Sequence, residues 1–128
     1  MARNCESHGL QKVNIREKLT LCSDYSNPRI VGELNGQHVK LTKFQGEFVW
    51  HRHAGKDEMF LVVRGSFRMD FRDGSVTLHE GEFLIVPRGV EHRPVAEREV
   101  EVMLLEPALI KHAGDVASEL TVDECRRI

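Results

Sequence analysis

Two histidines and a glutamate lie close together in the middle of the chain, and their side chains are of types that bind transition metals. His51 and His53 are two residues apart in a segment that favours a strand, and Glu58 follows after a short polar loop. Residues two apart in a strand point to the same face, about 6–7 Å from each other at the backbone. Both imidazoles can therefore reach one ion at about 2.0–2.2 Å. A hairpin would bring Glu58 back beside them.

A third histidine follows a turn later in the chain. The segment 83–86 is apolar, as in a buried strand, and Pro87 and Gly89 come directly after it. Proline presets φ and glycine permits a positive φ, so this turn can direct His92 into the interior. We therefore predict a site for one divalent transition metal per chain, with four ligands: His51, His53, Glu58 and His92.

The elements that must position these ligands are short strands separated by turn signals. Their spacing is typical of a sandwich or barrel. Asn35-Gly36 and Asp73-Gly74 each predict a type I′ turn in a tight hairpin, because both dipeptides tolerate positive φ. The sequence thus predicts an all-β core. The predicted strands are 29–34, 37–44, 47–53, 58–64, 66–72, 75–79, 83–86, 91–96 and 99–106.

A short helix is predicted before the strands. Asn14 followed three residues later by Glu17 is typical of a capped helix start, and the pattern continues for about two turns towards Ser23. The chain then divides into three parts. We expect an N-terminal segment with the short helix at 1–27, a barrel domain at 28–107 and a C-terminal tail at 108–128.

Two predicted strands, 58–64 and 83–86, are apolar on both of their faces. An antiparallel sheet with one face in water alternates instead. Phe48 and Trp50 are predicted to lie on the face opposite the histidine pair, where they would be bare to water. We therefore expect a homodimer that covers this surface. For Trp50 the alternative is burial beneath the N-terminal helix of its own chain.

The composition disfavours several partners and compartments. The 128 residues suit one domain, and the net charge of −2 provides no electrostatic signal for nucleic acid or an anionic membrane. The apolar runs are far shorter than the roughly 20 residues needed to span a bilayer. With no apolar signal segment at the start, we expect a cytoplasmic protein. Cys5, Cys22 and Cys125 are too widely spaced for a zinc ribbon or a disulfide framework.

These residues resemble the two conserved motifs of the cupin superfamily. The first motif reads Gly46, His51, His53, Glu58 and Gly65, and the second reads Gly81, Pro87, Gly89 and His92. The chain has one residue fewer after Gly46 than the family pattern and has Ala96 in place of an asparagine. The resemblance implies a cupin-type double-stranded β-helix, or jelly-roll, barrel with a central metal, usually in a homodimer. The chain is most similar to small bacterial cupins described as mannose-6-phosphate isomerase-like.

Three histidines and one carboxylate leave open coordination positions on the ion. Such a site suits Fe, Mn, Ni or Co, and Zn less exclusively. One hypothesis is an enzyme that acts on a small oxygen-rich metabolite, as a dioxygenase or as a Lewis-acid isomerase or lyase. The alternative is a non-catalytic module in which the metal anchors a small ligand for binding or sensing. We favour the enzyme because the open positions lie inside an apolar barrel. The sequence identifies no catalytic residue beyond the ligands.

Overall fold

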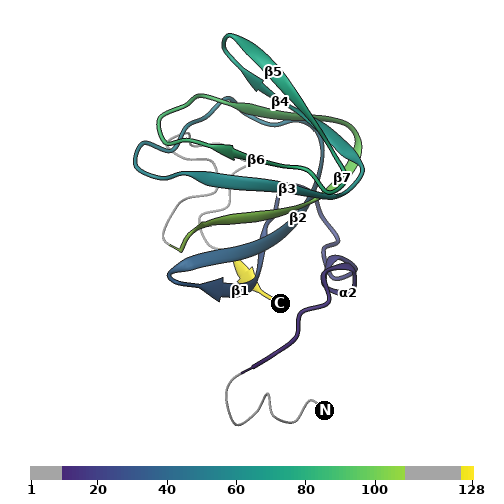
Figure 1. The fold of residues 1–128 in the computed structure, drawn as a ribbon. Coiled ribbons are helices and arrows are strands. Elements are labelled where there is room, and N and C mark those ends of the chain that lie inside the picture. Colours follow the sequence, from purple (N-terminus) through teal and green to yellow (C-terminus); the bar gives the residue numbers. More distant parts are fainter. Residues whose placement is uncertain (1–9, 109–124) are drawn as a thin grey trace.

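The computed structural model describes residues 10–108 and 125–128, which fold into a strand-dominated barrel with a short helix before it (Figure 1). This confirms the predicted all-β class. None of the helices in this part of the chain is long and apolar enough to cross a membrane. The elements are α2 (Ile15–Leu19), β1 (Arg29–Leu34), β2 (Gln37–Glu47), β3 (Glu58–Arg64), β4 (Ser66–Phe71), β5 (Gly74–His79), β6 (Phe83–Val86), β7 (Arg93–Pro107) and β8 (Arg126–Arg127).

The long strand β7 is central to the barrel, because it pairs with β2 along one side and with β4 and β3 along the other. Along one side it pairs with β2 over the whole length of that strand. Along its other side, the first residues of β7 pair with β4 and the later residues pair with β3. The remaining strands extend from this centre, with β5 beside β4, β6 beside β3, and β1 and β8 beyond β2. In Figure 1 the β4–β5 hairpin and the β3–β6 pair therefore lie at different levels of the barrel.

The prediction of two strands at 91–96 and 99–106 is wrong, because β7 is continuous through the polar residues 97–99. Those residues are exposed but remain in the strand. The register with β2 shifts between Phe44 and Gly46, which is a bulge that absorbs the extra residues. Gly46 has a φ of 87° there, a conformation that glycine adopts without steric cost.

Both predicted hairpins form, but only one has the predicted turn. Asn35 and Gly36 have φ values of 51° and 78°, as a type I′ turn requires. In the second hairpin Phe71 pairs with Gly74, so the two loop residues are 72 and 73 and not the Asp73-Gly74 dipeptide. The loop therefore begins one residue earlier than predicted, and Gly74 already belongs to β5.

The predicted strand at 47–53 is also wrong, since β2 ends at Glu47 and residues 48–50 lie outside any strand. Partner β7 begins only at Arg93, so little backbone is left to pair with this segment. Separate contacts remain: a hydrogen bond of 3.0 Å from the Phe48 amide to the Pro94 carbonyl, an isolated bridge between His51 and His92, and a hydrogen bond from the Gly89 amide to the His53 carbonyl. The histidine segment is thus held at separate points and not along a ladder.

The short helix α2 packs on the outer face of the sheet. Its predicted cap is present, since the Asn14 side chain accepts a hydrogen bond of 3.0 Å from the Glu17 amide. The helix is shorter than predicted and ends at Leu19. Leu19 packs with Cys22 and Leu41 in a small apolar cluster outside the barrel. Cys22 and Cys125 are free thiols, whereas Cys5 and residues 109–124 of the predicted tail lie outside the described residues.

Trp50 is half-buried, but not beneath the helix. The guanidinium carbon of Arg72 lies 3.9 Å from the centre of its ring, and that of Arg93 lies 5.0 Å away. These cations cover the indole by cation–π contact. Burial of Trp50 under α2 is therefore wrong, because the apolar face of the helix packs against Leu41 instead.

The main core fills the barrel interior with apolar side chains from β2, β3, β4, β5, β6 and β7. At one end of this core the Phe60 ring lies beside the histidines, with its centroid 6.1 Å from that of His92. At this end the interior changes from apolar to polar. The buried members are Phe44, Phe60, Val62, Phe67, Met69, Leu78, Val86, Ala96, Val100, Val102 and Leu104.

Candidate metal centre

The backbone around the histidines brings three chain segments together. His51 and His92 exchange two backbone hydrogen bonds, of 3.0 Å and 2.9 Å, which fixes the two residues side by side. The Gly89 amide donates to the His53 carbonyl at 2.8 Å, so the turn after β6 is bound to the histidine segment. Glu58 is the first residue of β3, directly after the loop that follows His53. The Pro87–Gly89 turn therefore does direct His92 inward.

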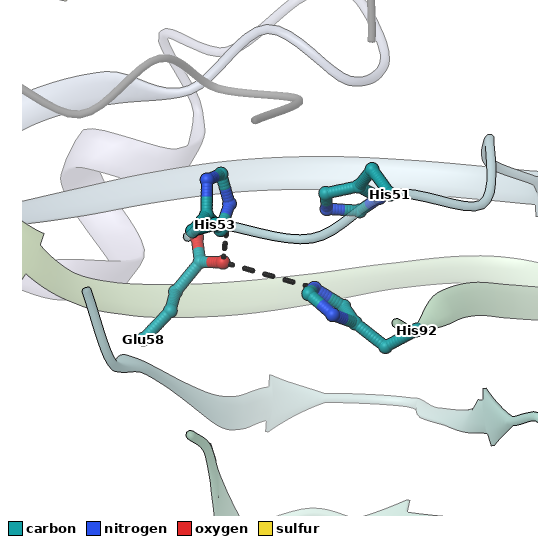
Figure 2. Close-up of side chains that lie close together, drawn as sticks. All are labelled: His51, His53, Glu58 and His92. Carbon is teal, nitrogen blue, oxygen red and sulfur yellow. Dashed lines mark ion pairs between the residues drawn. The ribbon is translucent and has the colours of Figure 1, made fainter. Parts of the chain in front are cut away.

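All four predicted ligands converge in the barrel interior (Figure 2). One ligand atom of each side chain can be chosen so that all four lie within 4.8 Å of one another. The Nε2 atom of His53 is 3.3 Å from Oε1 of Glu58, and that of His92 is 4.0 Å from the same oxygen. Each of the four residues is at most 4% exposed. Ligands of one ion at bonds of about 2.1 Å lie roughly 3–4 Å apart, so small side-chain shifts suffice.

Two of the imidazoles are held in the tautomer that metal binding needs. Nδ1 of His51 is 2.8 Å from the Val49 carbonyl, and Nδ1 of His92 is 2.9 Å from the Val90 carbonyl. Because a carbonyl only accepts, Nδ1 carries the proton and the lone pair is on Nε2. Nε2 of His92 is buried without a hydrogen-bond partner in the described chain. An unsatisfied lone pair inside a protein is costly, and a metal ion would satisfy it.

Burial controls the charge of the cluster. It raises the pKa of Glu58 to about 7, although the contact with Glu106 and the charge of Lys40 act in the opposite direction. It lowers the pKa of His92 to about 4, partly offset by the Val90 carbonyl, while His53 lowers it further. His92 is therefore neutral at pH 7, as a ligand must be. A divalent cation would stabilise the Glu58 carboxylate that burial alone disfavours.

A buried ion pair lies next to the cluster of four predicted ligands. The sequence analysis did not identify this pair. Nζ of Lys40 is 2.8 Å from Oε1 of Glu106, and the two side chains are 2% and 0% exposed. The Glu106 carboxyl group also contacts that of Glu58. Burial raises the pKa of Glu106 to about 8, and the neighbouring Glu58 carboxyl raises it as well. The alternation along β7, with Leu104 two residues before Glu106, was a signal that this glutamate faces inward.

A cavity lies on one side of the cluster. His51 and Glu58 form its polar end, and the Phe48 ring meets the His51 ring edge-on with centroids 5.4 Å apart. The prediction that Phe48 faces away from the histidines is therefore wrong, because residues 48–50 do not follow strand alternation. The remaining lining residues are Ser26, Thr42, Phe44, Phe60, Pro94 and Leu104.

The comparisons with known proteins agree with this fold. Residues 37–107 match the Cupin domain family, so the chain belongs to the cupin family. A cupin-2 domain protein from Shewanella frigidimarina is 43% identical, with a TM-score of 0.73 over 74% of this chain and 93% of that one. The uncharacterized protein YdbB of Bacillus subtilis is 38% identical over 49% of this chain and 57% of its own length. The chain thus matches little more than half of that curated relative.

A more distant structure shares the fold alone. Hydroquinone 1,2-dioxygenase PnpCD, determined in complex with Fe3+, is 17% identical and has a TM-score of 0.69. The similarity covers 84% of this chain and 35% of that one. At this identity the likeness establishes a common barrel and does not extend to the reaction.

Proposed function

We propose that the chain is a metal-dependent enzyme that holds one divalent transition metal through His51, His53, Glu58 and His92. The proposal is supported by the buried position of all four side chains and by the chemistry of the donor set. Three neutral nitrogens and one carboxylate suit Fe, Mn, Co or Ni and leave coordination positions for a substrate. A bound ion would supply Lewis-acid activation of a substrate oxygen, or redox chemistry with dioxygen if the ion is iron.

The cavity beside the cluster is the observation that carries the proposal of catalysis. It reaches His51 and Glu58 from the side of Phe48, so a molecule in it lies next to the ligand atoms. Its space of about 30 Å³ is enough for about two water molecules, so the substrate is small or displaces Phe48. The segment 48–50 is not part of a strand, so a shift of the Phe48 side chain would break no strand ladder.

The lining indicates the kind of molecule. Phe44, Phe60 and Leu104 provide an apolar wall that excludes water, and the hydroxyl groups of Thr42 and Ser26 can hydrogen-bond a polar substituent. Among the described lining residues there is no lysine or arginine, which a phosphate group would need. We therefore propose a substrate that binds the metal through its oxygens and is otherwise largely apolar. A phosphorylated sugar is not included.

The proposed reaction class depends on which titratable side chains line the cavity. Apart from His51 and Glu58, no titratable side chain among the described residues lines the cavity. Proton transfer by a separate acid or base is therefore not part of the proposal. The reactions that fit are a dioxygenase reaction or a Lewis-acid isomerisation or cleavage, in which the residues bind, orient and shield the substrate.

We also propose that the protein acts as a homodimer. Phe83 and Ile85 of edge strand β6 are 59% and 52% exposed, and they pair with Leu61 and Met59 of β3. These four side chains form an apolar surface on the outside of the barrel, away from the cluster. Such a surface is typical of a contact between subunits.

The experiment that tests the enzymatic proposal is a metal-by-substrate screen. Metal-free protein is loaded separately with Fe(II), Mn(II), Co(II), Ni(II) or Zn(II), with and without oxygen. Each form is offered small catechols, hydroxy acids and keto acids, while oxygen uptake and products are followed. We expect turnover by at least one metal form and none by a His51→Ala control. Binding of these compounds without turnover in any form would instead favour a metal-anchored binding module.

A further inference from the structure

The buried pair of Lys40 and Glu106 has no evident structural purpose. Both side chains are almost fully buried in a barrel whose other interior residues are mainly apolar. Removing two charges from water is costly, and apolar residues of similar volume often stabilise a protein equally well. The pair therefore suggests a role that apolar residues could not fulfil.

The strand register places this pair directly behind the cluster. Met59 of β3 pairs with Leu105 of β7, so Glu58 and Glu106 are the next residues along the two strands and face the same interior. Their carboxyl groups interact with each other, and Oε1 of Glu106 accepts a hydrogen bond from Lys40. A continuous chain of contacts therefore runs from Lys40 through Glu106 and Glu58 to the nitrogens of His53 and His92.

Lys40 is itself held from a second direction. Burial raises the pKa of the Cys125 thiol, one residue before β8, and Lys40 lowers it, so the two groups interact. Strand β8 in turn pairs with β1, whose other partner is β2, the strand that carries Lys40. The ammonium group of Lys40 thus interacts with both Cys125 and Glu106.

We propose that Glu106, anchored by Lys40, is a positioning residue that holds the Glu58 carboxylate in the orientation needed for metal binding. This inference depends on the metal site proposed above. Glu58 is the only charged ligand of the four, and Glu106 interacts with its carboxyl group while the histidines approach Oε1 of Glu58. Partners of this kind beyond the direct ligands typically change metal affinity by 10- to 100-fold.

Two substitutions of Glu106 remove the same charge, so a comparison of the two variants distinguishes a positioning role from a simple charge effect. Glu106→Gln keeps a carbonyl that can accept from Lys40 and an amide that can donate to Glu58. Glu106→Met introduces a side chain of similar length that makes no hydrogen bonds to Lys40 or Glu58. We expect Glu106→Gln to bind Co(II) within about threefold of the wild type. Glu106→Met should bind at least about tenfold more weakly and show a changed visible absorption spectrum of bound Co(II).

The double substitution Lys40→Met with Glu106→Leu tests the role without leaving an unpaired charge. The matched control is Lys43→Met with Glu101→Leu, which removes a cross-strand ion pair from the same two strands. We expect the metal-free forms of both double variants to have unfolding temperatures close to that of the metal-free wild type. Only the first should lose Co(II) affinity.

The outcomes distinguish the two proposals. If the wild type binds Co(II) and Glu106→Met binds it with the same affinity and spectrum, the positioning role is wrong and the metal site stands. If the wild type binds no Co(II), Mn(II), Fe(II), Ni(II) or Zn(II), the metal site itself is wrong and the positioning role falls with it. If the Lys40→Met and Glu106→Leu variant does not fold, the comparison of Glu106→Gln with Glu106→Met still decides the question.

Discussion

The two halves of the barrel interior are built from the same strands but have opposite character. Strand β7 contributes Val100 and Val102 to an apolar half, and a few residues later Glu106 to a polar half. The apolar half buries aromatic and aliphatic side chains against each other, which stabilises the fold. The polar half buries three histidines, two glutamates and a lysine, which by themselves disfavour it. The comparison suggests that one half provides the stability that lets the other be shaped for a metal.

The largest effect on stability is expected in the apolar half. Phe67 is buried, and its ring meets that of Phe44 edge-on at 5.1 Å between centroids. Phe67→Ala leaves a cavity and should lower the free energy of unfolding by about 3–5 kcal/mol in urea titrations of the metal-free protein. The exposed Val76→Ala is the control, with a change within about 0.5 kcal/mol. An equally small loss for Phe67→Ala would show that this half is not the stabilising one.

The polar half should respond to pH through Glu58. In the metal-free protein the pKa of Glu58 is about 7, so metal binding must release its proton at lower pH. Affinity should fall about tenfold per pH unit below 7 and level off above it. His92, whose pKa is about 4, does not compete with the metal in this range. Titration calorimetry between pH 5.5 and 8 measures the slope. The Glu58→Gln variant should bind the metal more weakly, and its affinity should lose most of the pH dependence. An unchanged slope of affinity against pH in this variant would show that another group releases the proton.

Substitutions on the outer surface of the barrel should affect neither the apolar nor the polar half of its interior. Phe83→Glu with Ile85→Glu places charges on the exposed apolar surface of β6. Sedimentation should give about twice 14.7 kDa for the wild type and 14.7 kDa for the variant, with metal content unchanged. A wild type that sediments as a monomer at micromolar concentration would rule out the dimer.

The smallest effect is expected in the cluster between α2 and the outer face of the sheet. Cys22 is buried there beside Leu19 and Leu41. Cys22→Ser buries a hydroxyl group in an apolar site and should cost about 1 kcal/mol, measured by thermal unfolding. Metal affinity should stay the same because this cluster lies outside the barrel. A loss of metal would show that the helix and the interior are coupled.

Sequence analysis succeeded where local patterns determine structure. The strands at 29–34, 58–64 and 83–86 have the predicted bounds because turn residues delimit them, such as Asn35-Gly36 after the first and Pro87 after the last. The four ligands were predicted to converge from the spacing of two motifs, and the structure brings them together. Alternation alone also predicted the direction of His51 and His53.

Three of the failures share one physical reason, which is that they depend on pairing between distant segments. The segment 48–50 looks like a strand but finds no ladder, so Phe48 faces the site. The polar residues 97–98 were predicted as a break between two strands, yet β2 and its bulge at Gly46 keep β7 continuous. Lys40 and Glu106 lie 66 residues apart, and only the register of β2 and β7 brings them behind Glu58.

The most direct test of the central claim is the metal content of freshly purified protein and its histidine variants. We expect one equivalent of a divalent transition metal per wild-type subunit by elemental analysis, and none for His51→Ala or His92→Ala. Circular dichroism should show that both variants keep their β structure, because the apolar half is untouched. His38→Ala, which removes a buried histidine outside the cluster, should retain the full equivalent. One equivalent of metal in both His51→Ala and His92→Ala would contradict the assignment of the site.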